Sequence, residues 1–149
     1  MLRDIAPEDH DTLVALWIAA WTPVLPQIDF TARQGFIRER LKAFSCPPKR
    51  ARLLESKGIL AGFSLIDPLQ QDLEQIAVAP AFVGKGAAQI LIDDAKQIAG
   101  DRLTLSVNTD NPRAVAFYEK HGFCVTREGV SAASGLPILF MEWRLHPEL

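Results

Sequence analysis

The feature that most constrains the fold is a strand–helix–strand segment in the middle of the chain, residues 72–107. Residues 72–78 form a strand candidate, and residues 84–99 carry apolar side chains at helical spacing before a glycine stop at Gly100. Residues 102–107 then alternate apolar and polar side chains, as a half-buried strand does. Two strands joined by a helix run parallel and are connected by a right-handed crossover, so this segment predicts one parallel pair.

The elements on either side of this segment have the short spacings of antiparallel hairpins. The predicted strands outside it are residues 2–5, 51–55, 59–66, 123–127 and 138–145, and the predicted helices are residues 7–21, 31–44 and 111–122. Thr31 is the expected N-cap of the second helix, and Asn111 followed by Pro112 the expected start of the last one. We therefore predict a mixed α/β fold (α+β mixed sheet), with a central, mostly antiparallel sheet, one parallel βαβ crossover and helices on both faces. A length of 149 residues fits a single domain, residues 1–149.

Composition excludes several classes of protein. Hydrophobic residues make up 48% and charged residues 23%, as in ordinary globular proteins. The net charge of −2 argues against nucleic acid as a partner. The sequence shows no apolar run long enough to span a membrane and no signal-peptide pattern, so we expect no membrane association and a cytoplasmic location. The histidines and cysteines lie in no metal-binding motif, so no metal site is expected, and Cys124 is expected to be buried in a strand.

Two predicted helices begin at the carboxyl edge of the parallel strands, one at Gly84 and the other at Asn111. Residues 77–83, just before the first of these helices, include no Ser, Thr, Asp or Asn. The free amides of its first turn therefore lack the usual side-chain cap. Because the positive ends of both helices converge on one crevice, the arrangement favours an anionic ligand.

Two common nucleotide-binding motifs do not fit this segment. The P-loop motif GxxxxGK[ST] fails because Ala79 stands at its first glycine and Gly86 follows Lys85. The dinucleotide motif GxGxxG begins with Gly84 and Gly86 but meets Gln89 at its third glycine. A glycine pair alone also serves tight turns, so the choice of ligand depends on the surrounding motifs.

Three segments together resemble the GNAT superfamily of N-acetyltransferases. They are residues 73–78 (LEQIAV), 83–88 (VGKGAA) and 111–123 (NPRAVAFYEKHGF). Gly86 and Ala88 match the last two fixed positions of the family's pyrophosphate loop, Q/R-x-x-G-x-G/A, whereas Val83 departs from its usual Gln or Arg. The resemblance covers roughly residues 72–125. It implies a GNAT-like acyl-CoA N-acyltransferase fold with acetyl-CoA as cosubstrate and no metal.

The resemblance also implies most of a cofactor site. Backbone groups of residues 76–78 would pair with the pantetheine arm, and the glycine loop would hold the pyrophosphate mostly through its main chain. The last predicted helix would contact the cofactor on its other side. The cofactor-binding residues implied in this way are Ile76, Ala77, Val78, Val83, Gly84, Lys85, Gly86, Ala87, Ala88, Asn111, Ala114 and Phe117.

Acetyl transfer to an amine needs a base, an oxyanion donor and an acid. An alkyl ammonium has a pKa of about 10.4, so a base must take its proton directly or through water. Asp72 and Glu74 are expected to share the strand face that carries Ile76. Glu74 is the preferred base and Asp72 the second choice, with a solvated surface carboxylate as the competing interpretation of both. The amide of Val78 is the oxyanion candidate, and Tyr118 lies at the family's proton-donor position.

The acceptor pocket falls in the variable parts of the family, the first long loop and the last hairpin. Trp21 and Phe30 are candidate acceptor-binding residues, although core packing is the simpler role for the tryptophan. The acceptor is expected to be a primary amine, a small molecule being favoured over a protein amino group, and homodimers are common in the family. One competing hypothesis is a non-catalytic acyl-CoA-binding or sensing module, which would need neither Glu74 nor Tyr118. The other is a nucleotide-binding or oxidoreductase domain.

Overall fold

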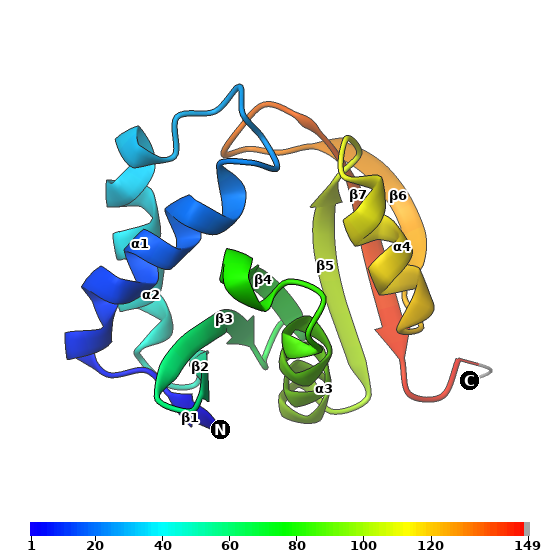
Figure 1. Cartoon of the computed structure of the whole chain (residues 1–149). Coiled ribbons are helices and arrows are strands. Elements are labelled where there is room, and N and C mark those ends of the chain that lie inside the picture. Colours follow the sequence, from blue (N-terminus) through cyan, green and yellow to red (C-terminus); the bar gives the residue numbers. More distant parts are fainter. Residues whose placement is uncertain (148–149) are drawn as a thin grey trace.

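A computed structural model describes residues 1–147 of the chain, which form one seven-stranded mixed sheet (Figure 1). The order of strands across the sheet is β1-β2-β3-β4-β5-β7-β6. The strands are β1 (Leu2–Asp4), β2 (Arg50–Ser56), β3 (Ile59–Asp67), β4 (Asp72–Val78), β5 (Arg102–Asn108), β6 (Cys124–Val130) and β7 (Pro137–Arg144). Neighbouring strands pair antiparallel except β4 and β5, which are parallel, as the βαβ segment predicts.

Four α-helices cover the two faces of this sheet. They are α1 (His10–Trp21), α2 (Gln34–Phe44), α3 (Ala87–Ala99) and α4 (Pro112–Lys120). On one face, α1 and α2 bury apolar side chains such as Leu13 and Leu41 against Phe63 and Leu65 of β3. On the other face, α3 packs against β3, β4 and β5, and α4 lies beside β7 (Figure 1). Apolar side chains of α3, α4, β5 and β7 form a second cluster there. The mixed sheet with helices on both faces is the fold expected from the sequence.

The parallel pair β4–β5 is interrupted, and this interruption creates the space for a site. Asp72 pairs with Thr104 at the start of both strands, and the Thr104 N–H donates to the carbonyl of Gln71 at 2.7 Å. Beyond that pair, no further β4–β5 ladder forms within residues 1–147. The second halves of the two strands are therefore free to diverge, while each keeps its antiparallel partner on its outer side.

Three local expectations differ from the structure. Helix α3 begins at Ala87 rather than at residue 84, because Gly84 and Gly86 adopt left-handed φ angles of +78° and +85°. Thr31 does not cap the second helix but lies in a 3₁₀ turn, where Asp29 accepts a hydrogen bond from the Ala32 N–H at 3.2 Å. Cys124 is exposed, because β6 is an edge strand of the sheet.

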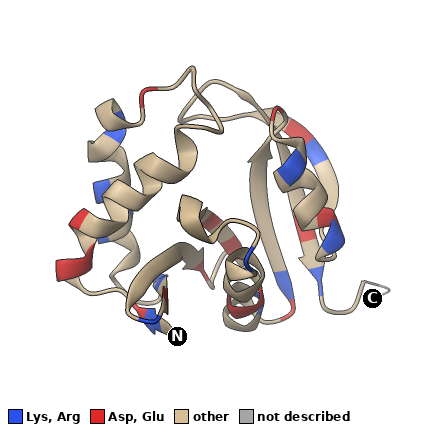
Figure 2. Cartoon of the chain, in the orientation of Figure 1, with Lys and Arg blue, Asp and Glu red and all other residues tan. Residues whose placement is uncertain are grey.

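Charged residues of both signs are scattered over the molecule in the view of Figure 2, in keeping with the small net charge. Within residues 1–147, no helix is long and apolar enough to cross a bilayer. The same residues contain no cluster of three or more His, Cys, Asp or Glu side chains that could hold a metal ion.

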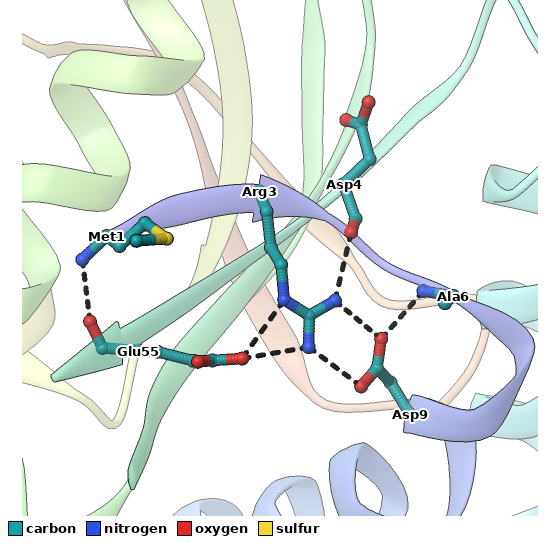
Figure 3. A network of polar contacts seen from close by, with 6 residues as sticks. All are labelled: Met1, Arg3, Asp4, Ala6, Asp9 and Glu55. Carbon is teal, nitrogen blue, oxygen red and sulfur yellow. Dashed lines mark hydrogen bonds and ion pairs between the residues drawn. The ribbon is translucent and has the colours of Figure 1, made fainter. Parts of the chain in front are cut away.

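A hydrogen-bond network around Arg3 holds β1, the edge strand opposite β6, against β2 (Figure 3). The Arg3 guanidinium donates to both carboxylate oxygens of Asp9, at 2.8 and 2.9 Å, and to Glu55 on β2 at 2.8 and 3.0 Å. Asp9 in turn accepts a hydrogen bond from the Ala6 N–H at 2.7 Å. The Arg3 guanidinium lowers the pKa of Asp9, so the network stabilises the ionised carboxylate.

We expect Arg3→Met to lower the free energy of unfolding by about 1 kcal/mol at pH 7, since Arg3 is partly exposed and solvent screens its pairs. The folded-state pKa of Asp9 is depressed, so this contribution is present above the unfolded-state pKa of an aspartate and is lost as pH falls through the folded value. Urea unfolding of both proteins at pH 7 and pH 3 measures it. Arg38→Met, which removes one more exposed pair with Asp11, is the control and should cost less. A loss that does not shrink at acid pH would contradict the electrostatic origin.

Candidate active site

A cleft lies between the diverging second halves of β4 and β5. Its volume is about 480 Å³. Residues from α1, β4, the glycine loop, the start of α3, β5 and α4 line it. Among them are Trp21, Ile76, Ala77, Val78, Val83, Gly84, Gly86, Ala88, Ser106, Asn111, Ala114, Phe117 and Tyr118. The cleft therefore gathers segments that are far apart in the sequence.

Backbone groups of β4 face this cleft. The Ala79 N–H donates to the carbonyl of Ala61 at 2.8 Å, so Val78 and its partner Gly62 form a non-hydrogen-bonded pair. The N–H and C=O of Val78 consequently point away from β3, toward the gap. Because the two kinds of pair alternate along an antiparallel ladder, the backbone groups of Ile76 point the same way. These groups are free to pair with an extended ligand.

The glycine loop presents uncapped helix amides to the same cleft. Gly86 is the N-cap of α3, and no side chain caps this helix. The first bond of its ladder runs from the Ile90 N–H to the carbonyl of Gly86, so the amides before Ile90 lack intrahelical acceptors. A Cβ added at Gly84 or Gly86 would meet no atom within 4 Å, so the space in front of both glycines is open. The loop thus has the geometry and the positive dipole end of an anion site.

Helix α4 carries Tyr118 on the opposite wall. Asn111 caps this helix as expected, its Oδ1 accepting from the Ala114 N–H at 3.3 Å. Tyr118 lines the cleft, yet only 8% of it is exposed, and its ring packs edge-on against Phe117 and Phe123. Burial raises the pKa of Tyr118 well above its ordinary value, which keeps the hydroxyl protonated at neutral pH.

Lys96 of α3 contacts the C-terminal end of α4. Its Nζ donates to the carbonyl of His121, just beyond the helix, at 2.7 Å and lies 4.9 Å from the centre of the Trp143 ring. A cation at this position also complements the negative end of the helix dipole. The Phe123 N–H donates to the carbonyl of Tyr118 at 3.0 Å. The position of Tyr118 therefore depends on contacts made by three separate elements.

The two candidate carboxylates do not share a face with Ile76, contrary to the sequence expectation. A register shift lies between Leu65 and Ile66 of β3, which pair with Gln75 and Leu73, so Glu74 is the extra residue of a β-bulge. The bulge breaks the alternation of side chains that the expectation assumed. Ile76 packs toward α3, whereas the side chain of Glu74 reaches Arg40 of α2 on the other side.

The surroundings of the two carboxylates differ. Glu74 accepts two hydrogen bonds from Arg40, at 2.6 and 2.9 Å, which occupy both of its oxygens. Asp72 accepts one from the Thr104 hydroxyl at 2.9 Å and forms no ion pair within residues 1–147. Burial raises the pKa of Asp72 above its ordinary value, the Thr104 hydrogen bond opposes this in part, and the nearby charges of Glu74 and Asp67 add to the rise. Of the two carboxylates, Asp72 is therefore the one that has no cationic partner within residues 1–147.

Most residues implied by the resemblance lie in the cleft, but four lie outside its lining. Ala87, the first residue of α3, is buried against the sheet, Lys85 does not line the cleft, and Asp72 lines a second hollow on the other face of the sheet. Phe30 is buried behind Trp21, against which it stacks at a centroid distance of 6.2 Å. Phe30 thus supports Trp21, which lines the cleft itself.

Several lining residues were not anticipated, chiefly Phe82 and Gln89 near the glycine loop and Arg113 and Lys120 around α4. His121, which the sequence offers as a possible base or as a partner of the helix dipole, also lines the cleft; it follows Phe117 by one turn, and its ring lies 4.4 Å from that ring. Burial and the charge of Lys96 lower the pKa of His121, so its imidazole is neutral at pH 7.

Comparison with known proteins agrees with this architecture. Residues 10–123 match the model of the acetyltransferase (GNAT) family. Because that match covers more than half of the chain, the protein belongs to the GNAT family.

Individual relatives are more distant. The apo-form solution structure of YjaB from Escherichia coli is 25% identical, with a TM-score of 0.79 over 96% of each chain. PaiA N-acetyltransferase of Thermoplasma acidophilum, solved with coenzyme A, is 19% identical, with a TM-score of 0.79 over 97% of this chain and 98% of that one. The uncharacterized protein ML0378 of Mycobacterium leprae (strain TN) is 31% identical over 93 residues, which are 60% of this chain and 26% of that protein. This chain thus spans about a quarter of that relative's length.

Proposed function

We propose that the protein transfers the acetyl group of acetyl-CoA to a primary amine by direct transfer in a ternary complex. The observation that carries this proposal is the conjunction, in one cleft, of uncapped α3 amides, free β4 backbone groups and a buried tyrosine. The amides after Gly86 suit a pyrophosphate, and the groups of Ile76 and Val78 suit the amide-containing pantetheine arm. Acetyl-CoA supplies an activated thioester, whose acetyl carbon bonds to the amine nitrogen while its bond to sulfur breaks.

Asp72 is the better candidate for the general base. Their hydrogen-bond partners separate the two carboxylates: both Glu74 oxygens are occupied by Arg40, whereas Asp72 has only the Thr104 hydroxyl. An ammonium acceptor must lose a proton before it attacks, and a carboxylate of raised pKa is the more effective acceptor of that proton. We therefore assign proton removal, directly or through water, to Asp72, in place of the Glu74 preferred from the sequence.

Tyr118 and the backbone of β4 supply the other two functions. The protonated Tyr118 hydroxyl donates its proton to the departing sulfur, so the proton lost by the amine is matched by one gained by the thiolate. At a strand rise of about 3.3 Å per residue, Val78 lies roughly 20 Å along β4 from Asp72. The Ile76 N–H, which also points toward the gap and is closer to Asp72, is therefore assigned to the negative charge that develops on the acetyl oxygen, in place of the Val78 amide expected from the sequence. A non-catalytic acyl-CoA-binding module would require neither group.

The activity itself is tested by adding acetyl-CoA and a panel of primary amines and following release of free thiol. We expect acetyl-CoA to raise the Tm of the protein, and at least one amine to release thiol at a rate above hydrolysis. Thermal stabilisation without thiol release from any amine would favour the binding module. Stabilisation by NAD or ATP but not by acetyl-CoA would overturn the proposal altogether.

We expect Asp72→Asn to lower kcat/KM by roughly a hundredfold or more, and Glu74→Gln to lower it by less than about tenfold. Initial rates between pH 5 and pH 9 measure both. Because the pKa of Asp72 is raised, the wild-type rate should fall on the acid side at a pH above the ordinary aspartate value, and only Asp72→Asn should remove that dependence.

Stability provides the control for this pair of variants. A raised folded-state pKa means that ionised Asp72 disfavours the folded state at neutral pH, and this cost vanishes as pH falls below the unfolded-state value. Asp72→Asn should therefore be at least as stable as the wild type at pH 7, so lost activity would not reflect unfolding. A larger effect of Glu74→Gln would return the base to Glu74.

A further inference from the structure

A second hollow lies on the opposite face of the sheet from α3 and α4. Its volume is about 410 Å³, and its floor is the face of β5 that carries Thr104 and Ser106. This face is opposite to that of Leu103 and Leu105, which pack in the α3–α4 cluster. The side chains around the hollow include Asp72, Glu74, Arg102, Thr126, Arg127, Phe140 and Glu142.

The second hollow adjoins the cleft through the gap between β4 and β5. Leu73 and Glu74 of β4 and Leu105 and Ser106 of β5 line both hollows. A molecule in the second hollow can therefore present a group at the gap without displacing a ligand from the cleft. Asp72 lies at this junction, where the two strands are still paired.

Ion pairing within the hollow leaves one group of each sign without a partner of opposite charge. Glu74 is paired with Arg40, and the Glu142 carboxylate is shared by Arg102 and Arg144. Asp72 and Arg127, by contrast, form no ion pair with any part of the chain that the structure describes. The hollow is thus left with two charged groups for a ligand: the Asp72 carboxylate beside the gap and the Arg127 guanidinium on β6.

The guanidinium of Arg127 is held in place by its surroundings. It lies over the Phe140 ring, with its central carbon 3.6 Å from the ring centre. Gly129, one full pleat along β6, makes room for that ring, because a Cβ there would lie 2.6 Å from it. Because the stack already restricts the Arg127 side chain, Arg127 loses less conformational entropy when it binds an anion.

We infer that the acceptor is a small amine that also carries a carboxylate, with its amino group beside Asp72 and its carboxylate at Arg127. This inference rests on the proposed function and names its acceptor class. A polyamine fits the hollow less well, because two of the three carboxylates are already neutralised by arginines and Arg127 would repel a second ammonium. Arg127 is then a residue that determines specificity rather than one that moves protons.

The test uses three matched series of acceptors with the wild-type protein and acetyl-CoA: ω-amino acids from glycine to ε-aminocaproate, alkylamines of the same chain lengths, and diamines of the same chain lengths. Thiol release gives kcat and KM for each. We expect the best ω-amino acid to exceed the alkylamine and diamine of equal length by at least about tenfold in kcat/KM, the discrimination typical of one charge-assisted contact.

Arg127→Gln should raise the KM of that amino acid by about tenfold and leave kcat and the KM of its alkylamine counterpart unchanged. Arg38→Gln, on the exposed side of α2, is the control and should change neither. Diamines or alkylamines used equally well, or an equal effect of Arg127→Gln on acceptors with and without a carboxylate, would overturn the inference while leaving the acetyltransferase proposal intact. Absence of thiol release with every amine would overturn both.

Discussion

Replacing Tyr118 with phenylalanine is expected to lower kcat by roughly a hundred- to ten-thousandfold, the usual contribution of a positioned general acid. The change removes one hydroxyl and keeps the ring that packs against Phe117 and Phe123. The Kd for acetyl-CoA should therefore stay within about twofold, because the glycine loop and the β4 backbone are untouched. Steady-state thiol release and calorimetric titration with acetyl-CoA measure the two quantities.

A contrasting variant separates catalysis from binding. Phe117→Leu alters the cleft wall on the same helix without touching the hydroxyl, so it should weaken acetyl-CoA binding more than it lowers kcat. The raised pKa of Tyr118 also predicts that the wild-type rate does not decline on the alkaline side up to about pH 10, since the acid remains protonated. Normal turnover by Tyr118→Phe would remove the tyrosine from the mechanism.

The second large effect is expected at the glycine loop. Gly86→Val should raise the Kd for acetyl-CoA by about tenfold to a hundredfold, which corresponds to the loss of one hydrogen bond to a charged group, about 1.5–3 kcal/mol. The added side chain would project into the open space in front of the α3 amides, and φ at this residue is +85°. Lys85→Ala should change the Kd by only about twofold, because an exposed charge contributes little.

Gly58→Val is a matched control for the strain at Gly86. Gly58 lies in the β2–β3 turn with a φ of +77°, and an added Cβ there also meets nothing within 4 Å. Both valine variants should lower the Tm to a similar extent, whereas only Gly86→Val should weaken binding. If Lys85→Ala proved the more harmful change, the phosphate site would depend on side-chain charge rather than on the main chain.

The sequence was sufficient for those parts of the site that depend on local chemistry. The absence of a capping side chain before α3, the Asn111 cap of α4 and the glycines of the loop are all readable from short segments, and the structure has the uncapped α3 and the Asn111 cap. The strand–helix–strand order of residues 72–107 likewise predicted the parallel pair β4–β5. These features follow from backbone hydrogen bonding within a few residues, which a short pattern specifies.

The roles of the two carboxylates could not be separated in the same way. The bulge at Glu74 arises from the pairing of β4 with β3, and no residue type near Glu74 indicates a bulge in the sequence. Arg40, which occupies Glu74, comes from a helix distant in sequence. Strict alternation therefore placed Glu74 on the wrong side of the sheet.

By itself, then, the sequence determined the order of the elements, the membership of a family and a glycine loop that leaves the first amides of α3 uncapped, because each depends on short-range patterns. Only the tertiary structure decided that β4 and β5 pair at a single position and that Asp72 rather than Glu74 has no cationic partner. It also decided that Arg127 of β6 stacks on Phe140 of the neighbouring strand β7. These features depend on strand register and on ion pairs between distant segments, which are set when the whole sheet assembles.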